Sequence, residues 1–473
     1  MPPDKSQRRS SDPRKSPGGY KKRLSSDKTR FAAFCFLVAC VFAMGGGSRA
    51  DIMSLPILRP LAFFVGSYAL LVARPGELRR VAWPLNLLAA LAALMLCQLV
   101  PLPESLWSQL PGRGLYVKIA ADAGIPLGSR PLTLSPSRTL NALFSLVVPL
   151  AAVLIFAVQG SRWRPRVWTV LLIACATSAV VAIAQIASPG NGALYLYKIT
   201  NNDFPVGLFA NRNHQALLMA ILLLLLTQFS LDPQRPVQLG TLPIIGLAFA
   251  GLVVFALILV TGSRAGLLLG ALIIPAAVSM HARANRGVAS FEWNARRKWA
   301  AAALAGALLV LVGVALALSR ASSIQRLWSD GALSDYRLDQ LPMVLAMLRD
   351  HWLSGIGFGA FEGAFMRYET LAALSPFTFN AAHDDWLQFP LEGGLPATIL
   401  LVVAIFWLAR ESIGLVRQWR SGIDVTRTTA VLILVLIAAA STVDYPLRTP
   451  IFMLIGAIAV SHLVGGRFKP TST

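Results

Sequence analysis

The chain has 473 residues, of which 55% are hydrophobic and only 14% charged, and its mean hydropathy is +0.62. This composition excludes a water-soluble enzyme of this length and indicates a polytopic membrane protein. The net charge of +21 would suggest nucleic-acid binding in a soluble protein, but most of it lies where membrane proteins carry orientation signals, so no nucleic-acid partner is expected.

Apolar stretches close to the ~20 residues that cross the hydrocarbon core recur along the chain. Gly, Pro and Arg punctuate them, as expected for turns between membrane helices. We therefore predict an all-α, polytopic fold with about twelve transmembrane helices, in the range of ten to twelve. The expected spans are 31–48, 54–72, 81–100, 139–158, 167–187, 208–230, 239–260, 264–281, 299–318, 388–409, 429–443 and 450–465.

Positive charge is concentrated at the N-terminus and in alternate loops. Residues 1–30 carry ten Lys/Arg against three Asp and no apolar cluster, which indicates a disordered, basic cytoplasmic tail rather than a signal peptide. With this tail inside, an even number of spans returns the C-terminus to the cytoplasm. It also places the basic loops there, as the positive-inside rule requires, at 73–80, 160–166, 281–298 and 409–420.

The same order of spans assigns the long loop 319–387 to the far side of the membrane, together with 101–138 and 188–206. This loop holds five Arg and eight Asp/Glu, so orientation signals do not explain it. Extramembrane loops of this length usually carry function. The four cysteines fall inside predicted spans and form no CxxC pair, so neither metal binding nor redox chemistry is expected of them.

The stretch GLFANRNHQALLMAILLLLL, residues 207–226, begins with polar residues and continues as a membrane span. Asn211 is a candidate helix cap, which places Arg212 in the first turn, where the helix dipole disfavours a cation. An anion shared between the helix N-terminus and the guanidinium would remove that penalty. The alternative is an ordinary arginine that reaches the interface. His214 is expected to be a helix-surface or packing residue.

Two further arginines stand out on the same side. VTGSRAGLLLG, residues 260–270, is a tight turn that places Arg264 in a short outer loop, where the positive-inside rule disfavours it unless it has a local partner. In the long loop, apolar residues recur at spacings of four, three and four from Leu341 to Trp352, which predicts an amphipathic helix that lies in the interface or packs on the bundle. Arg337 is expected just ahead of this helix. The SGIGFG that follows is interpreted as a turn, because no strand precedes the glycines as in a nucleotide-binding loop.

The stretch FNAAHDDWLQFPLEGGLPATIL, residues 379–400, closes the long loop. His383 stands beside two carboxylates, Asp384 and Asp385, immediately before a predicted span, a position suited to proton transfer. The loop offers too few His, Cys and carboxylate ligands at usable spacing for a metal site.

In their order along the chain, these motifs resemble those of the O-antigen ligase and O-antigen polymerase superfamily, which are bacterial inner-membrane transferases. The resemblance covers roughly residues 200–405 and rests on GLFANRNHQA, the SRAG turn, the stretch from Arg337 to GIGFGAF, and NAAHDDWLQFPLEGGLP. It implies three parts after the tail: N-terminal transmembrane helices at 31–200, a catalytic region at 201–405 that includes the long loop, and C-terminal helices with a short cytoplasmic tail at 406–473.

The resemblance further implies a GT-C-like glycosyltransferase that uses a glycan linked to undecaprenyl diphosphate, works on the periplasmic side of the inner membrane, and needs no metal or other cofactor. By motif, Arg264, Arg337 and His383 match the family's essential basic residues, and Arg212 and Asn211 match its asparagine-rich helix start. Such a transfer leaves negative charge on the departing diphosphate, which arginines can bind bidentately in place of a divalent ion.

The role of the histidine stays open between two functions. His383 would accept the proton of the acceptor hydroxyl or donate a hydrogen bond to the diphosphate, and Asp384 or Asp385 could be the base instead.

Within the superfamily the acceptor decides the function. We expect a polymerase of a surface polysaccharide or exopolysaccharide, whose acceptor is a carrier-linked repeat unit. The alternatives are a ligase that transfers the glycan to the lipid A core, or a transferase to protein. Other expected partners are membrane lipid and further polysaccharide-assembly proteins.

The rival from another class is a transporter, such as a flippase for lipid-linked oligosaccharides. Coupled transporters place ionisable residues near the middle of their spans. Here the predicted spans are nearly free of them, and the main exception, Arg59, lies near the outer end of the second span. This distribution favours the transferase.

Overall fold

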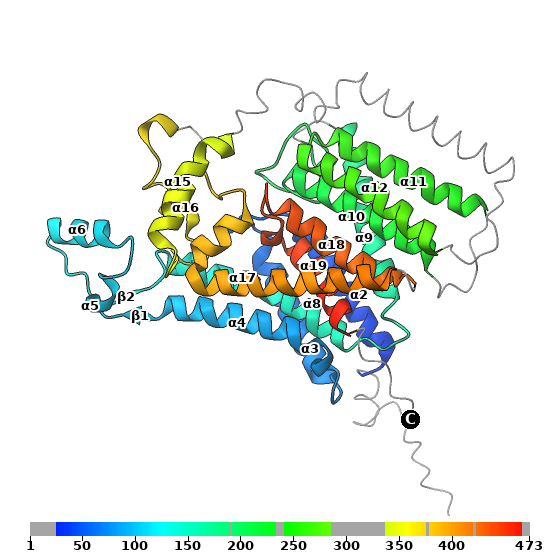
Figure 1. Cartoon of the computed structure of the whole chain (residues 1–473), viewed down its shortest axis with the longest axis horizontal. Coiled ribbons are helices and arrows are strands. Elements are labelled where there is room, and N and C mark those ends of the chain that lie inside the picture. Colours follow the sequence, from blue (N-terminus) through cyan, green and yellow to red (C-terminus); the bar gives the residue numbers. More distant parts are fainter. Residues whose placement is uncertain are drawn as a thin grey trace, which may run out of the picture.

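The computed structural model describes residues 25–188, 192–232, 241–284, 336–374, 378–419 and 422–465. Within these ranges the fold is all-α and polytopic, as predicted (Figure 1). The longer helices are α2 (Asp27–Met44), α3 (Leu55–Val72), α4 (Ala82–Leu99), α9 (Arg166–Ile186), α10 (Arg212–Leu231), α11 (Thr241–Val260), α12 (Arg264–Ala284), α15 (Tyr336–His351), α17 (Asp385–Gln418), α18 (Val425–Ala440) and α19 (Pro450–Gly465).

Shorter elements connect them. The short helices are η1 (Leu78–Val81), α5 (Glu104–Trp107), α6 (Gly114–Asp122), α7 (Pro136–Ser145), α8 (Val147–Ala157), α16 (Phe361–Phe365), η3 (Leu371–Ala373) and η4 (Pro446–Arg448). Two strands of two residues, β1 (Pro101–Leu102) and β2 (Arg130–Pro131), pair antiparallel, with Pro101 opposite Pro131. They close the base of an arm formed by α5 and α6, which extends past the end of α4 (Figure 1).

Seven helical segments in the described part of the chain are long and apolar enough to cross a membrane. They are α3, η1 with α4, α7 with α8, α9, α10, α12 and α17, and the shorter apolar helices in α11, α18 and α19 add to them. Together with α2, these elements coincide with eleven of the predicted spans. The span predicted at 299–318 lies outside the described residues.

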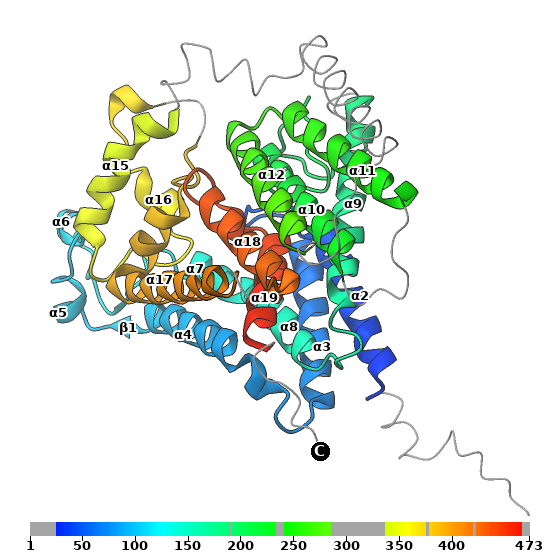
Figure 2. The ribbon, with the colours of Figure 1, turned by 45° about the vertical axis from the view of Figure 1, so that its right-hand side comes forward.

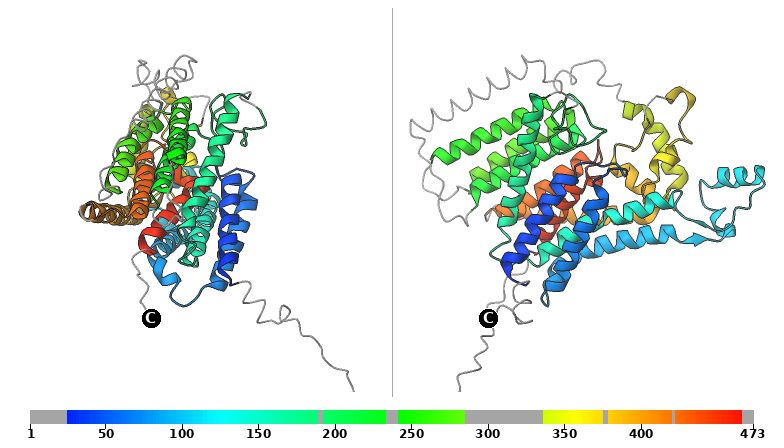
Figure 3. Two further views of the ribbon diagram at one scale, coloured as in Figure 1. Left: turned by 90° about the vertical axis from the view of Figure 1, so that its right-hand side faces the viewer. Right: turned by 180° about the vertical axis from the view of Figure 1, so that it is seen from behind.

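The centre of the molecule is α8, which is apolar on every face and therefore almost completely buried. It packs against α3 and α19, while α10 packs against α9, α11, α12 and α18. Figure 2 shows α9 to α12 gathered on one side of α18 and α19, and α15, α16 and the start of α17 on the other. α2 and α3 run side by side along one edge (Figure 3).

The loops predicted to share the far side of the membrane meet at one end of the helices. The Gly46 N–H donates to the Tyr197 hydroxyl at 2.7 Å, which joins the loop after α2 to the loop after α9. The Leu134 N–H donates to the Ile356 carbonyl at 2.8 Å, which joins the segment after α4 to the long loop. Loops of one predicted side thus form one continuous layer.

The basic loops meet at the opposite end. Arg30, in the first turn of α2, pairs with Glu77 in the loop after α3 at 3.0 Å. Arg283, at the end of α12, donates a hydrogen bond to the Trp419 carbonyl after α17. The two sets of loops are therefore separated by the length of the helices, as their alternation along the sequence predicts.

The described part of the long loop folds around a small core of its own that contains Val344, Met347, Phe361, Phe365 and Phe379. Val344 and Met347 belong to the buried face of α15.

This buried face differs from the predicted one by a single position. Leu345 is 47% exposed and Trp352 is 53% exposed, although both belong to the predicted apolar stripe. The cause is tertiary, because the aromatic core of the loop lies against the neighbouring face of the helix. The predicted position of Arg337 is also corrected: α15 begins at Tyr336, so Arg337 lies inside its first turn rather than ahead of it.

The SGIGFG segment is a turn, as predicted, and it supports a kink in α17. Gly355, Gly357 and Gly359 adopt φ of 69°, 100° and 79°, a backbone conformation that glycine adopts without a steric penalty. In α17, Gly394 has φ 65° and ψ −157°, which breaks the helix into two parts. The Leu395 N–H beyond the kink donates to the Leu353 carbonyl at 3.1 Å, so the turn and the kink are held together.

Candidate active site

The connection between α18 and α19, residues 441–449, carries a buried carboxylate at the end of the helices where the far-side loops meet. The Asp444 side chain is 3% exposed, and its Oδ2 accepts hydrogen bonds from Asn211 Nδ2 at 3.0 Å and Asn213 Nδ2 at 2.7 Å. Its Oδ1 accepts the Tyr445 N–H at 2.9 Å. Three N–H donors suit an ionised carboxylate, which only accepts hydrogen bonds. Asp444 therefore holds the polar start of α10.

Two histidines face the same carboxylate. His214 Nε2 lies 3.7 Å and His383 Nδ1 lies 3.9 Å from Asp444 Oδ1. His214 is buried and its ring contacts the rings of Phe209 and Phe452, so it is a packing residue. The His383 side chain is 20% exposed, which leaves it accessible from the loop side.

The backbone at His383 is unusual. Its φ of 54° lies in the left-handed region, which is uncommon for a residue with a side chain and is concentrated at functional sites. Its ring centre is 4.9 Å from that of Tyr445 and 5.6 Å from that of Phe379. These contacts fix the imidazole between the long loop and the 441–449 connection.

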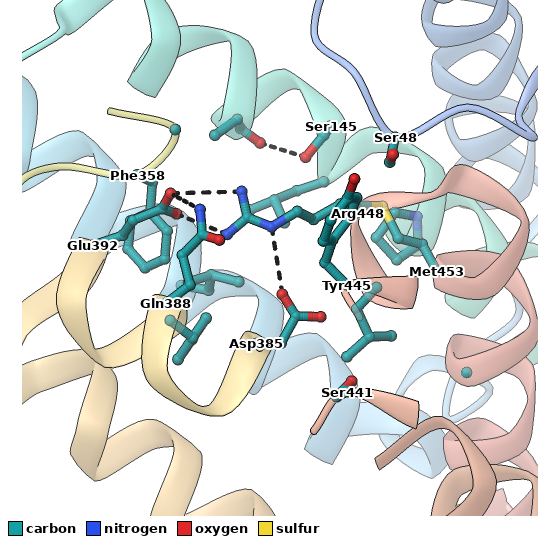
Figure 4. Close-up of a pocket in the computed structure, with 18 of the residues that line it drawn as sticks. Ser48, Ser145, Phe358, Asp385, Gln388, Glu392, Ser441, Tyr445, Arg448 and Met453 are labelled. Atoms are coloured by element: carbon teal, nitrogen blue, oxygen red, sulfur yellow. Dashed lines mark hydrogen bonds and ion pairs between the residues drawn. The ribbon is translucent and has the colours of Figure 1, made fainter. Parts of the chain in front are cut away.

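Arg448 follows in the same connection and pairs with two carboxylates of α17. Its Nε lies 3.4 Å from Asp385 Oδ1, and its Nη2 lies 3.3 Å from Glu392 Oε2. Gln388 adds a hydrogen bond to Glu392 at 2.8 Å. Burial opposes the charge of Arg448, but the two carboxylates outweigh it and raise its pKa further. Figure 4 shows the side chain reaching across the pocket from beside Tyr445 to Glu392.

Arg448 lies at the polar end of a cavity of about 600 Å³. This volume is within the range of pockets that bury a drug-sized ligand. Away from the arginine the wall is apolar and comes from the membrane helices α4, α17, α18 and α19, through residues such as Leu88, Leu91, Leu401, Ile405, Leu434 and Val460. The cavity thus joins the loop layer to the interior of the helical bundle.

Three more arginines line the cavity. Arg49 pairs with Asp51 at 3.1 Å and Arg138 pairs with Glu362 at 3.3 Å. The pKa of Asp51 is lowered, first by the Arg49 hydrogen bond and also by the charge of Arg138 nearby.

Arg59, in the first turns of α3, has a different kind of partner. Its Nη1 donates to the amide oxygen of Asn141 on α7 at 2.7 Å.

Among the described residues, no group of three His, Cys, Asp or Glu side chains is close enough to hold a metal ion. The polar groups gathered here are an imidazole, carboxylates, amides and guanidinium groups. Such a set can exchange a proton and bind an anion.

The model of a protein family described as O-antigen ligase matches residues 248–402. This part of the chain is similar to an O-antigen ligase domain. The match confirms the resemblance to the O-antigen ligase superfamily and indicates glycosyltransferase-type activity, with a lipid-linked glycan and a saccharide acceptor as the general substrates. A search of curated proteins finds no match.

The matched region contributes Arg264, His383 and Asp385 to this end of the molecule, while Asp444 and Arg448 come from the connection between α18 and α19 beyond it. The site is therefore assembled from the matched region and the connection between the C-terminal helices.

The structure places Asn211 and Arg212 as the sequence predicts. Asn211 caps α10 by accepting the Asn213 N–H at 2.8 Å. Arg212 is the first residue of the helix, is half-buried, and its guanidinium lies 4.3 Å from the Phe204 ring centre.

Arg264 occupies the equivalent place in the neighbouring helix, because it is the first residue of α12. α10 and α12 pack together, and a Cβ placed on Gly266 would collide with Ala216, so the two helix starts lie side by side. Arg337 lies in the first turn of α15, and its side chain is outside what the structure describes. The structure thus brings the starts of α10 and α12 together.

The two aspartates that follow His383 have separate functions. Asp384 caps α17 through hydrogen bonds from the Trp386 N–H at 2.8 Å and the Leu387 N–H at 3.2 Å. Burial raises the pKa of Asp384, against the lowering effect of these two bonds. Asp385 instead faces the cavity and pairs with Arg448.

Sequence reasoning missed Asp444, Arg448, Arg49 and Arg138. The signal was present for the arginines, because all three lie in predicted outer loops, where the positive-inside rule disfavours them. The same argument had singled out Arg264. Nothing local distinguishes Asp444, since its function depends on residues more than 200 positions away in the chain.

Proposed function

We propose that this chain is a glycosyltransferase of the inner membrane that moves a glycan from undecaprenyl diphosphate to a sugar hydroxyl on the periplasmic face. The observation that carries the proposal is the arrangement around Asp444. This carboxylate lies 3.9 Å from His383 of the matched region and holds the asparagines at the start of α10. A histidine oriented by a carboxylate, beside arginine-bearing helix starts, suits acid–base chemistry next to an anion.

In the proposed reaction, the acceptor hydroxyl oxygen attacks the anomeric carbon of the donor sugar in one step. The bond from that carbon to the diphosphate oxygen breaks, and the electron pair leaves with the diphosphate. His383 takes the hydroxyl proton at Nε2 while its Nδ1–H is directed to Asp444, which stabilises the imidazolium that forms. The 3.9 Å separation of Nδ1 from Asp444 shortens when substrate binds, as catalytic hydrogen bonds commonly do.

The engagement of the two neighbouring aspartates supports His383 as the base. Asp384 already caps α17, and Asp385 is paired with Arg448. Protonation of either carboxylate would remove the negative charge that supports the helix cap or the ion pair, and so weaken these contacts. The second hypothesis for His383, a hydrogen bond to the diphosphate, is tested by the pH dependence of transfer.

Arg212, Arg264 and Arg337 are the proposed diphosphate ligands. Negative charge develops on the leaving diphosphate, and planar guanidinium groups can bind its oxygens in pairs without a metal. The adjacency of α10 and α12 supports this assignment, because it sets the first two arginines at neighbouring helix starts.

Substitution of the arginines tests the assignment. Arg264→Ala and Arg337→Ala should each lower transfer in membranes on the order of 100-fold or more. The Lys variants should retain part of the activity. Arg349→Ala is the matched control, since it removes an 81% exposed arginine from the same helix as Arg337. Full activity of both Ala variants at normal protein levels would refute the diphosphate assignment.

The acceptor that we propose is a carrier-linked repeat unit, so the protein would polymerise a surface polysaccharide or exopolysaccharide. The second candidate is a ligase that transfers the glycan to the lipid A core, and the description of the matched family favours it. A deletion strain separates the two. Single-repeat caps on the surface glycan indicate a lost polymerase, whereas long chains left on the undecaprenyl carrier indicate a lost ligase.

The separation of the loops into two ends supports the proposed orientation. Both termini would be cytoplasmic, with the basic loops, and the site around Asp444 would face the periplasm. Labelling of single cysteines with an impermeant reagent in intact cells tests it: a cysteine at position 203 should react and one at position 79 should not.

A further inference from the structure

Each arginine of the cavity except one is paired with a carboxylate. Arg448 has Asp385 and Glu392, Arg49 has Asp51, and Arg138 has Glu362. Opposite charges therefore cancel over most of the polar wall.

Arg59 is the exception among the described residues that line the cavity. Its hydrogen-bond partner is the neutral amide of Asn141, and its Nε is buried with no hydrogen-bond partner in the described part of the chain. An arginine stays charged in proteins, so a half-buried guanidinium without a carboxylate favours an anionic ligand. Asn141 fixes the orientation of the group through Nη1 and leaves Nη2 for that ligand.

The position of Arg59 limits what the anion can be. It lies near the start of α3, where the polar wall of the cavity meets the apolar wall formed by the membrane helices. A soluble anion would gain nothing from that apolar wall. A lipid with a phosphate at the end of its apolar chain complements both surfaces.

We propose that Arg59, oriented by Asn141, binds the phosphate of the acceptor lipid, and that this lipid is a single-chain polyprenyl diphosphate carrying a repeat unit. The inference rests on the proposed function. The diphosphate ligands proposed for the donor, Arg212 and Arg264, are not among the described residues that line the cavity, so the cavity is available to the second lipid substrate. A volume of about 600 Å³ suits part of one apolar chain rather than the several chains of a multiply acylated lipid.

This placement connects the acceptor to the proposed base. Tyr445 lines the cavity, and the centre of its ring lies 4.9 Å from that of His383. A glycan attached to a phosphate at Arg59 can extend past Tyr445 to the imidazole. The donor at the starts of α10 and α12 would approach the same imidazole from the other side of Asp444.

Native mass spectrometry of the purified full-length protein with undecaprenyl monophosphate tests the site without turnover. Wild type should retain two lipids, whereas Arg59→Gln and Arg264→Ala should each retain one. Arg59→Gln removes the charge and keeps a hydrogen-bonding group on a shorter side chain, whereas Arg59→Lys keeps the charge and should restore the second lipid in part. Arg349→Ala, which removes an exposed arginine that is not among the residues lining the cavity, should retain two.

Kinetics with a lipid-linked donor and acceptor supply the second measurement. Arg59→Gln should raise the acceptor KM about tenfold or more and leave the donor KM unchanged. A raised donor KM instead, or two lipids retained by Arg59→Gln, would overturn the assignment. Equal displacement of the Arg59-dependent lipid by a two-chain phospholipid such as phosphatidylglycerol would overturn the single-chain assignment.

The two proposals fail in different ways. If wild type holds two lipids, one of them dependent on Arg59, but forms no glycosidic bond, the proposed function is wrong and the lipid site stands. If transfer proceeds and Arg59→Gln changes neither lipid retention nor KM, the lipid site is wrong and the proposed function stands.

Discussion

Removal of the Arg448 charge should destabilise the protein strongly, because the substitution leaves two carboxylates of α17 without their cation. At separations of 3.3 to 3.4 Å, each contact has a gross Coulomb energy of about 5 kcal/mol at an effective dielectric constant of ~20. Desolvation offsets much of this in the wild type. In Arg448→Met, however, Glu392 remains 3% exposed and unpaired, so we expect a loss of about 3–5 kcal/mol.

A double-mutant cycle isolates the interaction. Glu392→Gln removes the carboxylate with little change in shape, and the combination with Arg448→Met should recover about 1–3 kcal/mol relative to the sum of the single variants. Thermal unfolding of detergent-purified protein, followed by intrinsic fluorescence, measures the four proteins. Arg427→Met is the matched control for the coupling. It breaks a pair with the buried Glu411 at 2.9 Å at the opposite end of the molecule, so it should also destabilise the protein, but its effect should add to that of Glu392→Gln. Strict additivity of the two substitutions, or a stable Arg448→Met, would refute the reasoning.

Three further predictions concern stability and transfer. Burial, with a smaller contribution from Arg113, lowers the pKa of His351 to about 4, so between pH 6.5 and about 4 the unfolded chain takes up a proton that the folded state does not. The contribution of His351 to stability should therefore fall by about 2 kcal/mol from pH 7.5 to pH 5, and His351→Gln should remove that part of the difference between melting curves at these two pH values. Gly394→Ala should lower the midpoint of thermal unfolding, because Gly394 has a positive φ and the added Cβ would lie 2.5 Å from a backbone oxygen. Gly414→Ala in the same helix is the control: its added Cβ meets nothing within 4 Å, so it should be neutral or stabilising. Asp444→Asn should lower glycan transfer on the order of 100-fold in a membrane assay, because an amide N–H would face the asparagine N–H groups that now donate to the carboxylate. Wild-type activity of this variant would contradict the function proposed for Asp444.

Hydropathy predicted the membrane helices well because lipid imposes the same requirement of length and apolarity on every span. The starts of helices could also be predicted, because capping residues contact backbone groups close to them in the chain. Asn211 caps α10 and Asp384 caps α17 through contacts within three residues along the chain. Sequence patterns contain such contacts directly.

Tertiary partners could not be predicted in the same way. Asp444 contacts Asn211 across 233 positions, and no periodicity records such a pairing. The helical period of α15 was predicted correctly, but its buried face was displaced by one residue because the aromatic core of the loop decides which face packs. The cavity likewise depends on helices from both ends of the sequence. The outer-loop position of its arginines was visible in the sequence, but that they line one cavity emerged only from the fold.

The most direct test of the proposed function is reconstitution of the purified protein with a defined undecaprenyl-diphosphate-linked glycan and a lipid-linked acceptor. The transferase that we propose should form one new glycosidic bond for each undecaprenyl diphosphate released, and His383→Ala should abolish both products together. Movement of the lipid-linked glycan across the bilayer with no new glycosidic bond would contradict the proposed function and indicate a transporter.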